Sequence, residues 1–356
     1  ASGSWQMYGV VFNTTDGDLE LSNKVVIGSL TGASFVDSYQ STIENQMHAV
    51  AFKPDGTKMY FGGFQNNSIR QFTLTTPFDV STASYDSKTY NIGTDVSGIA
   101  FSPDGTKMVV AQYQNNEVRY YTLSTAWDVT TASNQYGYSH SSQGNTPEGV
   151  QFNSDGTKMM ILTYSNDVIS EHSLSPAYVL NSSTAYTNTF FSVSSQAGTP
   201  RGFSFNSDGT KFFVVDANTV KVFEYSCTTA YDISTASYSG NEFSVNSQSN
   251  DPGDIAVTDS DTRMVYVSRD SSNPRLYEYS LVSATYPTGY HAAHTASSTD
   301  STYWTDINSM TADEAAGDGN IYYCVSTDDR TTWKIAKGTD GERSIVRNNS
   351  GTWQYN

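Results

Sequence analysis

One phrase with the residue types of a cation-binding loop recurs along the chain, but each copy carries a single aspartate. Asp55-Gly56-Thr57-Lys58 is followed by the same four residues at 104–107, 155–158 and 208–211. A calcium site needs about six to eight oxygen ligands, which several spaced acidic side chains supply. We therefore interpret each Asp-Gly-Thr-Lys as a tight hairpin turn and predict no metal site.

The usual catalytic patterns are missing from the sequence. It has no Gly-x-Ser-x-Gly, no phosphate-binding loop and no His-Glu-x-x-His. His291 and His294 form the one close histidine pair, and their spacing in a non-helical segment does not preset a zinc site. Nothing singles out a carboxylate pair among the 36 acidic residues. We predict no catalytic residue and no cofactor, and hence a protein that is not an enzyme.

Amide and aromatic side chains gather in a set of polar loops that suit the hydroxyls and C–H faces of sugars. Asn, Asp and Ser are also common turn formers, so a purely structural role is the alternative. The candidate ligand-binding residues are Phe64, Gln65, Asn66, Tyr113, Gln114, Asn115, Tyr164, Asn166, Asp216, Asn218 and Asp270.

The elements that must position these loops repeat about every fifty residues. The phrase from Phe52 to Lys58 returns with its aspartate at 104, 155 and 208, at intervals of 49, 51 and 53. A degenerate copy follows around Thr262. Alternating apolar and polar residues predict four strands in each copy, for example 50–52, 59–61, 69–72 and 85–92.

Four antiparallel strands in each repeat, with no helix, predict an all-β protein folded as a β-propeller. The length of 356 residues predicts about seven four-stranded blades, and six blades plus an extension is the alternative. Residues 34–42 resemble 84–90, which favours an N-terminal blade. We expect residues 1–356 to form a single propeller domain. Its approximate blades would be 1–45, 46–94, 95–145, 146–197, 198–250, 251–302 and 303–356.

The connector before each predicted fourth strand repeats an aromatic residue followed by aspartate. Phe78-Asp79, Trp127-Asp128 and Tyr231-Asp232 are examples. We expect the ring to pack between neighbouring blades and the carboxylate to accept backbone N–H bonds, and stacking on a carbohydrate is the alternative.

Composition limits the classes of partner. The formal charge of −17 argues against nucleic acids and anionic membrane surfaces, and no apolar run is long enough for membrane insertion. We expect Cys227 and Cys324 to be buried free thiols.

Two resemblances extend this interpretation. The Ser-Pro-Asp-Gly-Thr-Lys copies resemble the YVTN and NHL-type repeats of bacterial surface propellers over roughly residues 46–280. Residues 321–326, 328–334, 345–349 and 351–353 are similar to a module of bacteriophage virion proteins, especially tail fibres of marine phages.

Together these resemblances imply a non-enzymatic virion or tail-associated structural or receptor-binding propeller, with host-surface glycans as candidate ligands. Its partners would be other virion proteins or a host cell-surface glycan, its location virion or extracellular, and a homo-oligomer is open. The alternative is a secreted bacterial adhesin or lectin, and after it a glycan hydrolase or lyase.

Overall fold

A computed structural model describes residues 24–258 and 260–285, together with six short strands outside that range. These strands are Val10–Phe12 (β1), Leu19–Leu21 (β2), Tyr323–Val325 (β25), Trp333–Ala336 (β26), Ile345–Arg347 (β27) and Trp353–Tyr355 (β28). β1 pairs with β2, and β25 to β28 form a four-stranded antiparallel sheet. These strands belong to one compact unit, made of Ala1–Val25 and Ala284–Asn356, and the repeats belong to a second, Val26–Ser283.

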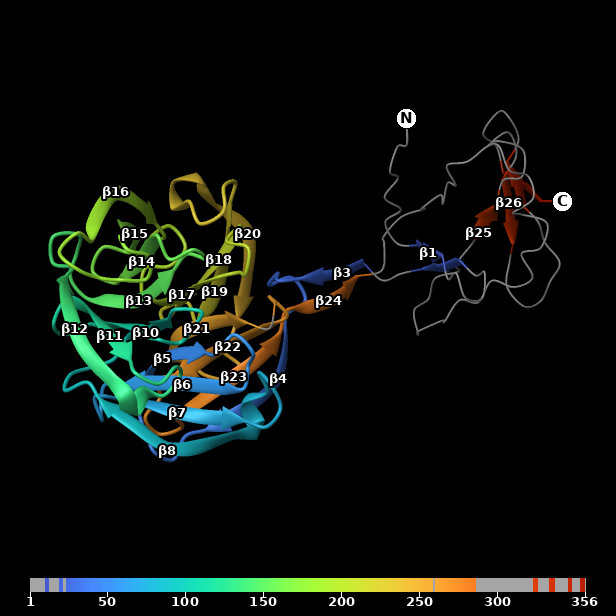
Figure 1. Ribbon diagram of the computed structural model, residues 1–356. Coiled ribbons are helices and arrows are strands. Elements are labelled where there is room, and N and C mark those ends of the chain that lie inside the picture. Colours follow the sequence, from blue (N-terminus) through green and yellow to red (C-terminus); the bar gives the residue numbers. More distant parts are fainter. Residues whose placement is uncertain are drawn as a thin grey trace. The chain divides into compact units, whose positions relative to one another are not determined.

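The second unit contains five four-stranded antiparallel sheets, which are the blades of a β-propeller (Figure 1). Blade 1 is Met47–Phe52 (β5), Lys58–Gly63 (β6), Ser68–Leu74 (β7) and Ala83–Asn91 (β8). Blade 2 is Gly98–Phe101 (β9), Lys107–Gln112 (β10), Glu117–Leu123 (β11) and Ala132–Ser139 (β12). Blade 3 is Pro147–Phe152 (β13), Lys158–Thr163 (β14), Val168–Ser173 (β15) and Ala185–Ser192 (β16). Blade 4 is Pro200–Phe205 (β17), Lys211–Asp216 (β18), Lys221–Cys227 (β19) and Ala236–Ser244 (β20). Blade 5 is Pro252–Thr258 (β21), Arg263–Ser268 (β22), Arg275–Ser280 (β23) and Ser34–Gln40 (β4).

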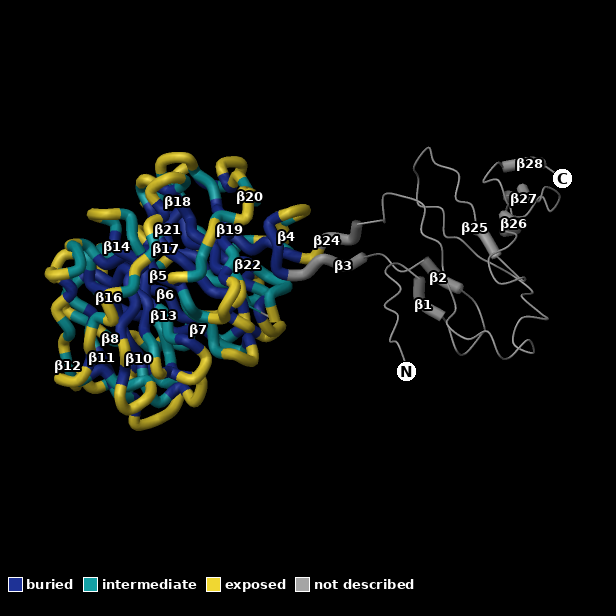
Figure 2. Tube along the Cα trace, turned by 90° about the horizontal axis from the view of Figure 1, so that it is seen from above, coloured by how far each residue is buried: buried dark blue, intermediate teal, exposed yellow. Residues whose placement is uncertain are grey.

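The first strands of the blades form the inner ring. β5 contacts β9, β9 contacts β13, and the series continues through β17 and β21 back to β5. Second and third strands are buried, whereas the fourth strands alternate between half-buried and exposed residues, and the yellow segments of Figure 2 lie mainly in loops and at the rim. The expected all-β propeller with four strands in each blade is confirmed.

The predicted number of about seven blades was wrong, and so was the alternative of six. Residues 34–42 resemble 84–90 because both contain the fourth strand of a blade: Ser34 and Phe35 in β4 match Ser84 and Tyr85 in β8. β4 does not begin a blade of its own, however, but pairs with β23 and completes blade 5. The assignment of residues 1–33 and 303–356 to the propeller domain stays a prediction, because most of them lie outside the described residues. β3 (Lys24–Ile27) pairs with β24 (Val282–Thr285).

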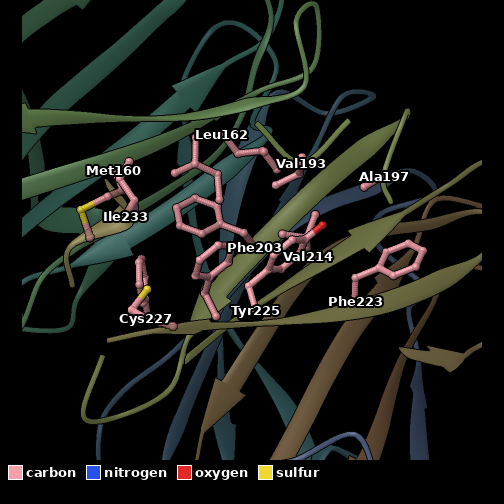
Figure 3. Close-up of a cluster of buried hydrophobic side chains, with 13 residues drawn as sticks. Met160, Leu162, Val193, Ala197, Phe203, Val214, Phe223, Tyr225, Cys227 and Ile233 are labelled. Atoms are coloured by element: carbon pink, nitrogen blue, oxygen red, sulfur yellow. The ribbon is translucent and has the colours of Figure 1, made fainter. Parts of the chain in front are cut away.

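Apolar side chains from facing blades fill the space between them. Between blades 3 and 4, Met160 and Leu162 pack in one cluster with Phe203, Phe212 and Tyr225 (Figure 3). Similar clusters join the other neighbouring blades.

Cys227 belongs to the cluster between blades 3 and 4 and is a buried free thiol, as expected. Burial raises its pKa to about 11, so the thiol stays protonated near neutral pH. Cys324 lies outside the residues whose side chains the structure describes.

The repeated Asp-Gly-Thr-Lys forms the turn between the first two strands of a blade, as predicted. Asp55 Oδ1 accepts hydrogen bonds from the Thr57 backbone N–H (3.0 Å) and hydroxyl (2.6 Å), and Gly56 has a φ of 71°. The connector aromatic of the same blade covers this glycine: the Phe78 N–H donates to the Gly56 carbonyl (3.0 Å). A Cβ on Gly56 would lie 2.4 Å from the Phe78 ring. The aromatic rings of the connectors therefore pack on their own hairpins, and Trp127 and Tyr231 also pack against the clusters between neighbouring blades, as expected.

The connector aspartates have the expected capping role. Asp79 Oδ1 accepts hydrogen bonds from the Ser81 N–H (3.0 Å) and hydroxyl (2.6 Å), and so caps the 3-10 turn Val80–Thr82 (η1). Asp128 and Asp232 cap Val129–Thr131 (η2) and Ile233–Thr235 (η3) in the same way.

Buried third-strand side chains tie two of these connectors to the preceding blade. Gln71 Oε1 accepts from the Val129 N–H at 3.2 Å, which links blade 1 to blade 2. Glu278 Oε2 accepts from the Val80 N–H at 3.0 Å and links blade 5 to blade 1, while its other oxygen pairs with Arg263.

Replacing Gly105 with alanine should destabilise the protein by about 2–4 kcal/mol, because the new Cβ meets the Trp127 ring and the backbone is left-handed. That Cβ would lie 2.3 Å from Trp127, and φ of Gly105 is 69°. Gly93→Ala is the control, since Gly93 has a φ of 82° with no atom within 4 Å of an added Cβ. The control should lose only about 1 kcal/mol in denaturant unfolding. Equal losses would contradict the packing role of Trp127.

Replacing Glu278 with alanine should reduce the free energy of unfolding by about 3–5 kcal/mol, because it leaves the Val80 N–H and Arg263 without this buried carboxylate. Glu242→Ala removes a half-exposed partner of Lys221 and should cost less than about 1 kcal/mol. Urea titration of both variants checks the difference, and a small loss for Glu278→Ala would show that this link does not hold the ring closed.

Candidate functional site

One end of the ring gathers the loops that the sequence analysis singled out. Antiparallel pairing places Met47, at the start of β5, opposite Gly63, at the end of β6. The same pairing joins Pro147 to Thr163 in blade 3. The connectors into the first strands and the loops after the second strands therefore share one face, which we call the loop face.

Three half-exposed aromatic rings form a continuous arc on the loop face. Phe64 follows β6, Tyr113 follows β10 and Tyr164 follows β14. The ring centroids of Phe64 and Tyr113 lie 5.7 Å apart, and those of Tyr113 and Tyr164 lie 6.3 Å apart. The repeat thus brings together three predicted site residues from three blades.

Charged and histidine side chains continue the arc. The His48 ring stacks on Phe64 at 3.6 Å, and the Arg201 Cζ lies 4.5 Å from the centroid of the Tyr164 ring. Burial, together with the charges of Arg269 and Arg201, lowers the pKa of His48 well below its ordinary value, so His48 is neutral at pH 7. The three rings and the two arginines therefore surround one end of the inner ring.

Glu148 lies beneath this arc on β13 and is 1% exposed. Its Oε1 accepts a hydrogen bond of 2.5 Å from Arg201 Nη1. Burial raises the pKa of Glu148 to about 7, although the Arg201 charge opposes the shift. The carboxyl group is therefore partly protonated near neutral pH.

Asp254 is a second buried carboxyl group in the inner ring. Its Oδ2 accepts from the Val50 N–H at 3.1 Å and its Oδ1 from the Ile255 N–H at 2.9 Å. Burial raises the pKa of Asp254 well above its ordinary value. Gly202 leaves the room for it, since a Cβ there would lie 2.2 Å from Asp254 Oδ1. Asp254 therefore joins β21 to β5.

A shallow hollow of about 440 Å³ adjoins the arc at the junction of blades 5 and 1. Arg269 lines it, and the Arg269 Nε and Nη2 atoms donate to Asp251 Oδ1 at 3.1 and 2.6 Å. Gln46 also lines it, and its carbonyl accepts from the Phe64 N–H at 3.3 Å. The hollow is polar, and the lining residues are Gln46, Asn250, Asp251, Arg269, Asp270 and Ser271.

The predicted amides mostly brace the loops. Asn66 Nδ2 donates to the Ile43 carbonyl (3.2 Å), and Asn166 Nδ2 donates to the Gln143 carbonyl (3.0 Å). Asn115 Nδ2 donates more weakly, to Gln112 Oε1 (3.3 Å). The exposed side chains that remain at the rim are Gln65, Gln114 and Asn218.

The two predicted aspartates have local roles. Asp216 is fully buried and accepts from the backbone N–H groups of Thr199 (2.6 Å) and Thr219 (2.7 Å), so it is a loop-bracing residue. Asp270 accepts from the Ser272 N–H at 2.9 Å and also lines the hollow.

Sequence reasoning missed His48, Glu148, Arg201 and Arg269, although the repeat contains a signal for them. The residue four places before the phenylalanine of each phrase is His48, Ser97, Glu148 or Arg201, and Gly253 is its match in the degenerate copy. The residue twelve places after it is Phe64, Tyr113, Tyr164, Ala217 or Arg269. Both positions vary in chemistry while the framework around them repeats.

Other findings concern metals and membranes. Within residues 24–258 and 260–285 and the short strands, no group of three histidine, cysteine or acidic side chains is arranged to hold a metal ion. His291 and His294 lie outside the described residues. None of the described helices is long and apolar enough to span a membrane.

Comparison with known proteins gives distant similarities only. No protein-family model and no curated protein matches the chain. A functionally unknown protein from Desulfotomaculum acetoxidans is 12% identical, with 91% of this chain and 94% of that one covered and a TM-score of 0.40. A Bacteroides uniformis protein provisionally named a 6-phosphogluconolactonase is 13% identical, with 97% and 89% covered and a TM-score of 0.42. Hydrazine synthase from Kuenenia stuttgartiensis is 12% identical over 64% and 57%, with a TM-score of 0.38. None of the activities in these names transfers to this chain at such values.

Replacing Glu148 with glutamine should change how stability depends on pH. With a folded pKa of about 7 against an ordinary value of 4.5, Glu148 keeps its proton in the folded state after the unfolded chain has lost it. The contribution of Glu148 to the free energy of unfolding is therefore full below pH 4.5 and is lost as pH rises through 7. The loss amounts to about 3 kcal/mol at pH 8. The free energy of unfolding of the unmodified protein minus that of Glu148→Gln should fall by this amount between pH 4.5 and 8. A difference that does not change with pH would contradict the shifted pKa.

Proposed function

We propose that the loop face is a non-enzymatic receptor-binding surface that takes a cell-surface glycan. The observation that carries this proposal is the arc of Phe64, Tyr113 and Tyr164, whose rings are half-exposed. The ring centroids of successive members lie 5.7 and 6.3 Å apart. Flat aromatic rings with polar neighbours bind the apolar faces and hydroxyls of sugars.

Their contacts distinguish these rings from the connector aromatics of the repeat. The connector rings such as Phe78 and Trp127 lie against the hairpin glycines, and Phe78 is only 7% exposed. Phe64, Tyr113 and Tyr164 cover no hairpin glycine and lie on the loop face instead. A row of adjacent, half-exposed aromatic rings is typical of a binding site.

Polar groups next to the arc supply the hydrogen bonds that a glycan requires. The rim carries the exposed amides of Gln65 and Gln114, and the polar hollow opens beside Phe64 through Gln46. Bracing of Asn66 and Asn166 by backbone carbonyls holds the loops in place before a ligand binds, which lowers the entropic cost of binding.

We further propose that the biological setting is a virion or tail-associated protein that meets a host cell. This rests on the similarity of residues 321–353 to phage virion modules, and those residues lie mostly outside the described part of the chain. A secreted bacterial adhesin or lectin would use the same loop face.

One observation favours an enzyme as the second candidate. The pKa of Glu148, raised by burial to about 7, suits a general acid or base. Its carboxyl group is 1% exposed and engaged by Arg201, however, so a substrate would have to displace Arg201 to reach it. Mass analysis of glycans incubated with the protein separates the candidates, because binding alone leaves their mass unchanged.

A glycan array should show saturable binding that depends on the aromatic arc. Tyr113→Ala and Tyr164→Ala should each weaken binding about tenfold or more, because each removes one stacking face. Phe190→Ala is the matched control, since Phe190 is a 58% exposed aromatic on β16, the fourth strand of blade 3. If the folded protein binds no glycan, or the control loses as much as the arc variants, the proposed function is wrong.

A further inference from the structure

We propose that the glycan bound on the loop face carries an oxyanion, a carboxylate or a sulfate on a pyranose, and that Arg201 binds this group. The inference rests on the proposed function and adds the chemical class of the ligand. Arg201 lies against the Tyr164 ring at the end of the aromatic arc, so one sugar residue stacked on Tyr164 brings its substituent to the guanidinium.

The hydrogen bonds of Arg201 leave one edge of its guanidinium unused. Nη1 donates to Glu148 Oε1 in a single bond. Nε is buried and has no hydrogen-bond partner, and among the described residues Nη2 has no acceptor either. An unpaired buried donor on a charged group is costly, and two oxygens of a carboxylate or a sulfate match the Nε and Nη2 pair in the two-bond geometry that arginine prefers.

Arg269 provides the contrast within the same arc. Its Nε and Nη2 both donate to Asp251 Oδ1, so the corresponding edge is already filled. The two arginines are similar in charge and in location, and they differ in whether this edge has an acceptor. The structure therefore assigns the oxyanion to Arg201.

Glu148 can adapt to such a ligand. Its carboxyl group faces Arg201, with the charges of Arg269 and Asp95 also acting on it, and its own charge acts on Tyr113 and Asp254. When Glu148 is protonated, no carboxylate charge offsets the positive charge of Arg201 at the ligand. Burial holds the pKa of Glu148 at about 7, so a small change in pH exchanges the proton.

The net charge of the chain cannot explain a preference for an acidic sugar. With a formal charge of −17, long-range attraction opposes an anion rather than drawing it in. Preference for an acidic sugar must therefore come from contact with the unpaired guanidinium edge of Arg201.

The test uses matched pairs of neutral and acidic oligosaccharides on one array, followed by titration calorimetry of the best pair. The pairs are lactose and sialyllactose, and the trimers of mannose and mannuronate, galactose and galacturonate, and galactose and its 6-sulfate. The acidic member of at least one pair should bind about ten to a hundredfold more tightly than its neutral partner. Arg201→Gln should abolish that preference, Arg269→Gln should reduce it less, and Arg119→Gln, at a half-exposed pair with Glu117, should leave it unchanged.

The double variant Glu148→Gln, Arg201→Gln keeps the buried site neutral and serves where Arg201→Gln alone fails to fold. In the unmodified protein, affinity for the acidic member should also rise between pH 8 and pH 6, and Glu148→Gln should remove this dependence. Equal binding of neutral and acidic members overturns the inference and leaves the proposed function standing. Equal losses for Arg201→Gln and Arg269→Gln overturn the assignment to Arg201, and no binding by any member overturns both proposals.

Discussion

Closure of the ring is the constraint on which the rest of this structure depends. Each blade packs on its neighbours, so an open row of blades would leave an apolar face exposed at either end. The chain closes the row by pairing β4, from the N-terminal side of the first blade, with β23 of the last. The Glu278 carboxylate on the Val80 N–H and Asp254 on the Val50 N–H add buried links at the same junction. Only with the ring closed do the ends of five inner strands face one another around the arc.

Aromatic residues have different roles at the two ends of the blades. At the hairpin end, the rings of Phe78, Trp127, Tyr178 and Tyr231 lie on the glycines of the Asp-Gly turns. Each of these four residues has a positive φ between 54° and 64°, which an aromatic side chain adopts only when its packing offsets the strain. At the loop face, Phe64, Tyr113 and Tyr164 are not needed to cover a turn. Similar residue types are structural at one end and available to a ligand at the other.

The sequence predicted the strands and turns of each repeat better than it predicted the number of blades. The spacing of the Asp-Gly phrases predicted the strands and turns, because alternation and turn chemistry are short-range properties. The blade number failed because nothing local in residues 34–40 says whether their partner is the next strand or β23, more than 230 positions away. For the site, the aromatic members of the arc were predicted from the loops. Arg201 and Glu148 were missed because they lie on different blades, 53 positions apart, and meet only through the packing of blade 3 against blade 4.

The buried ion pair at the arc is not a requirement of the fold. Ser97 and Gly253 occupy in blades 2 and 5 the register position that Glu148 and Arg201 occupy in blades 3 and 4. A small neutral residue is therefore compatible with the strand geometry there. Burying a carboxylate with a single hydrogen bond to arginine costs desolvation free energy that such a pair seldom recovers. The inner ring thus keeps a destabilising pair at the loop face, beside the half-exposed rings of the arc, which is the pattern expected of a site held ready for a ligand.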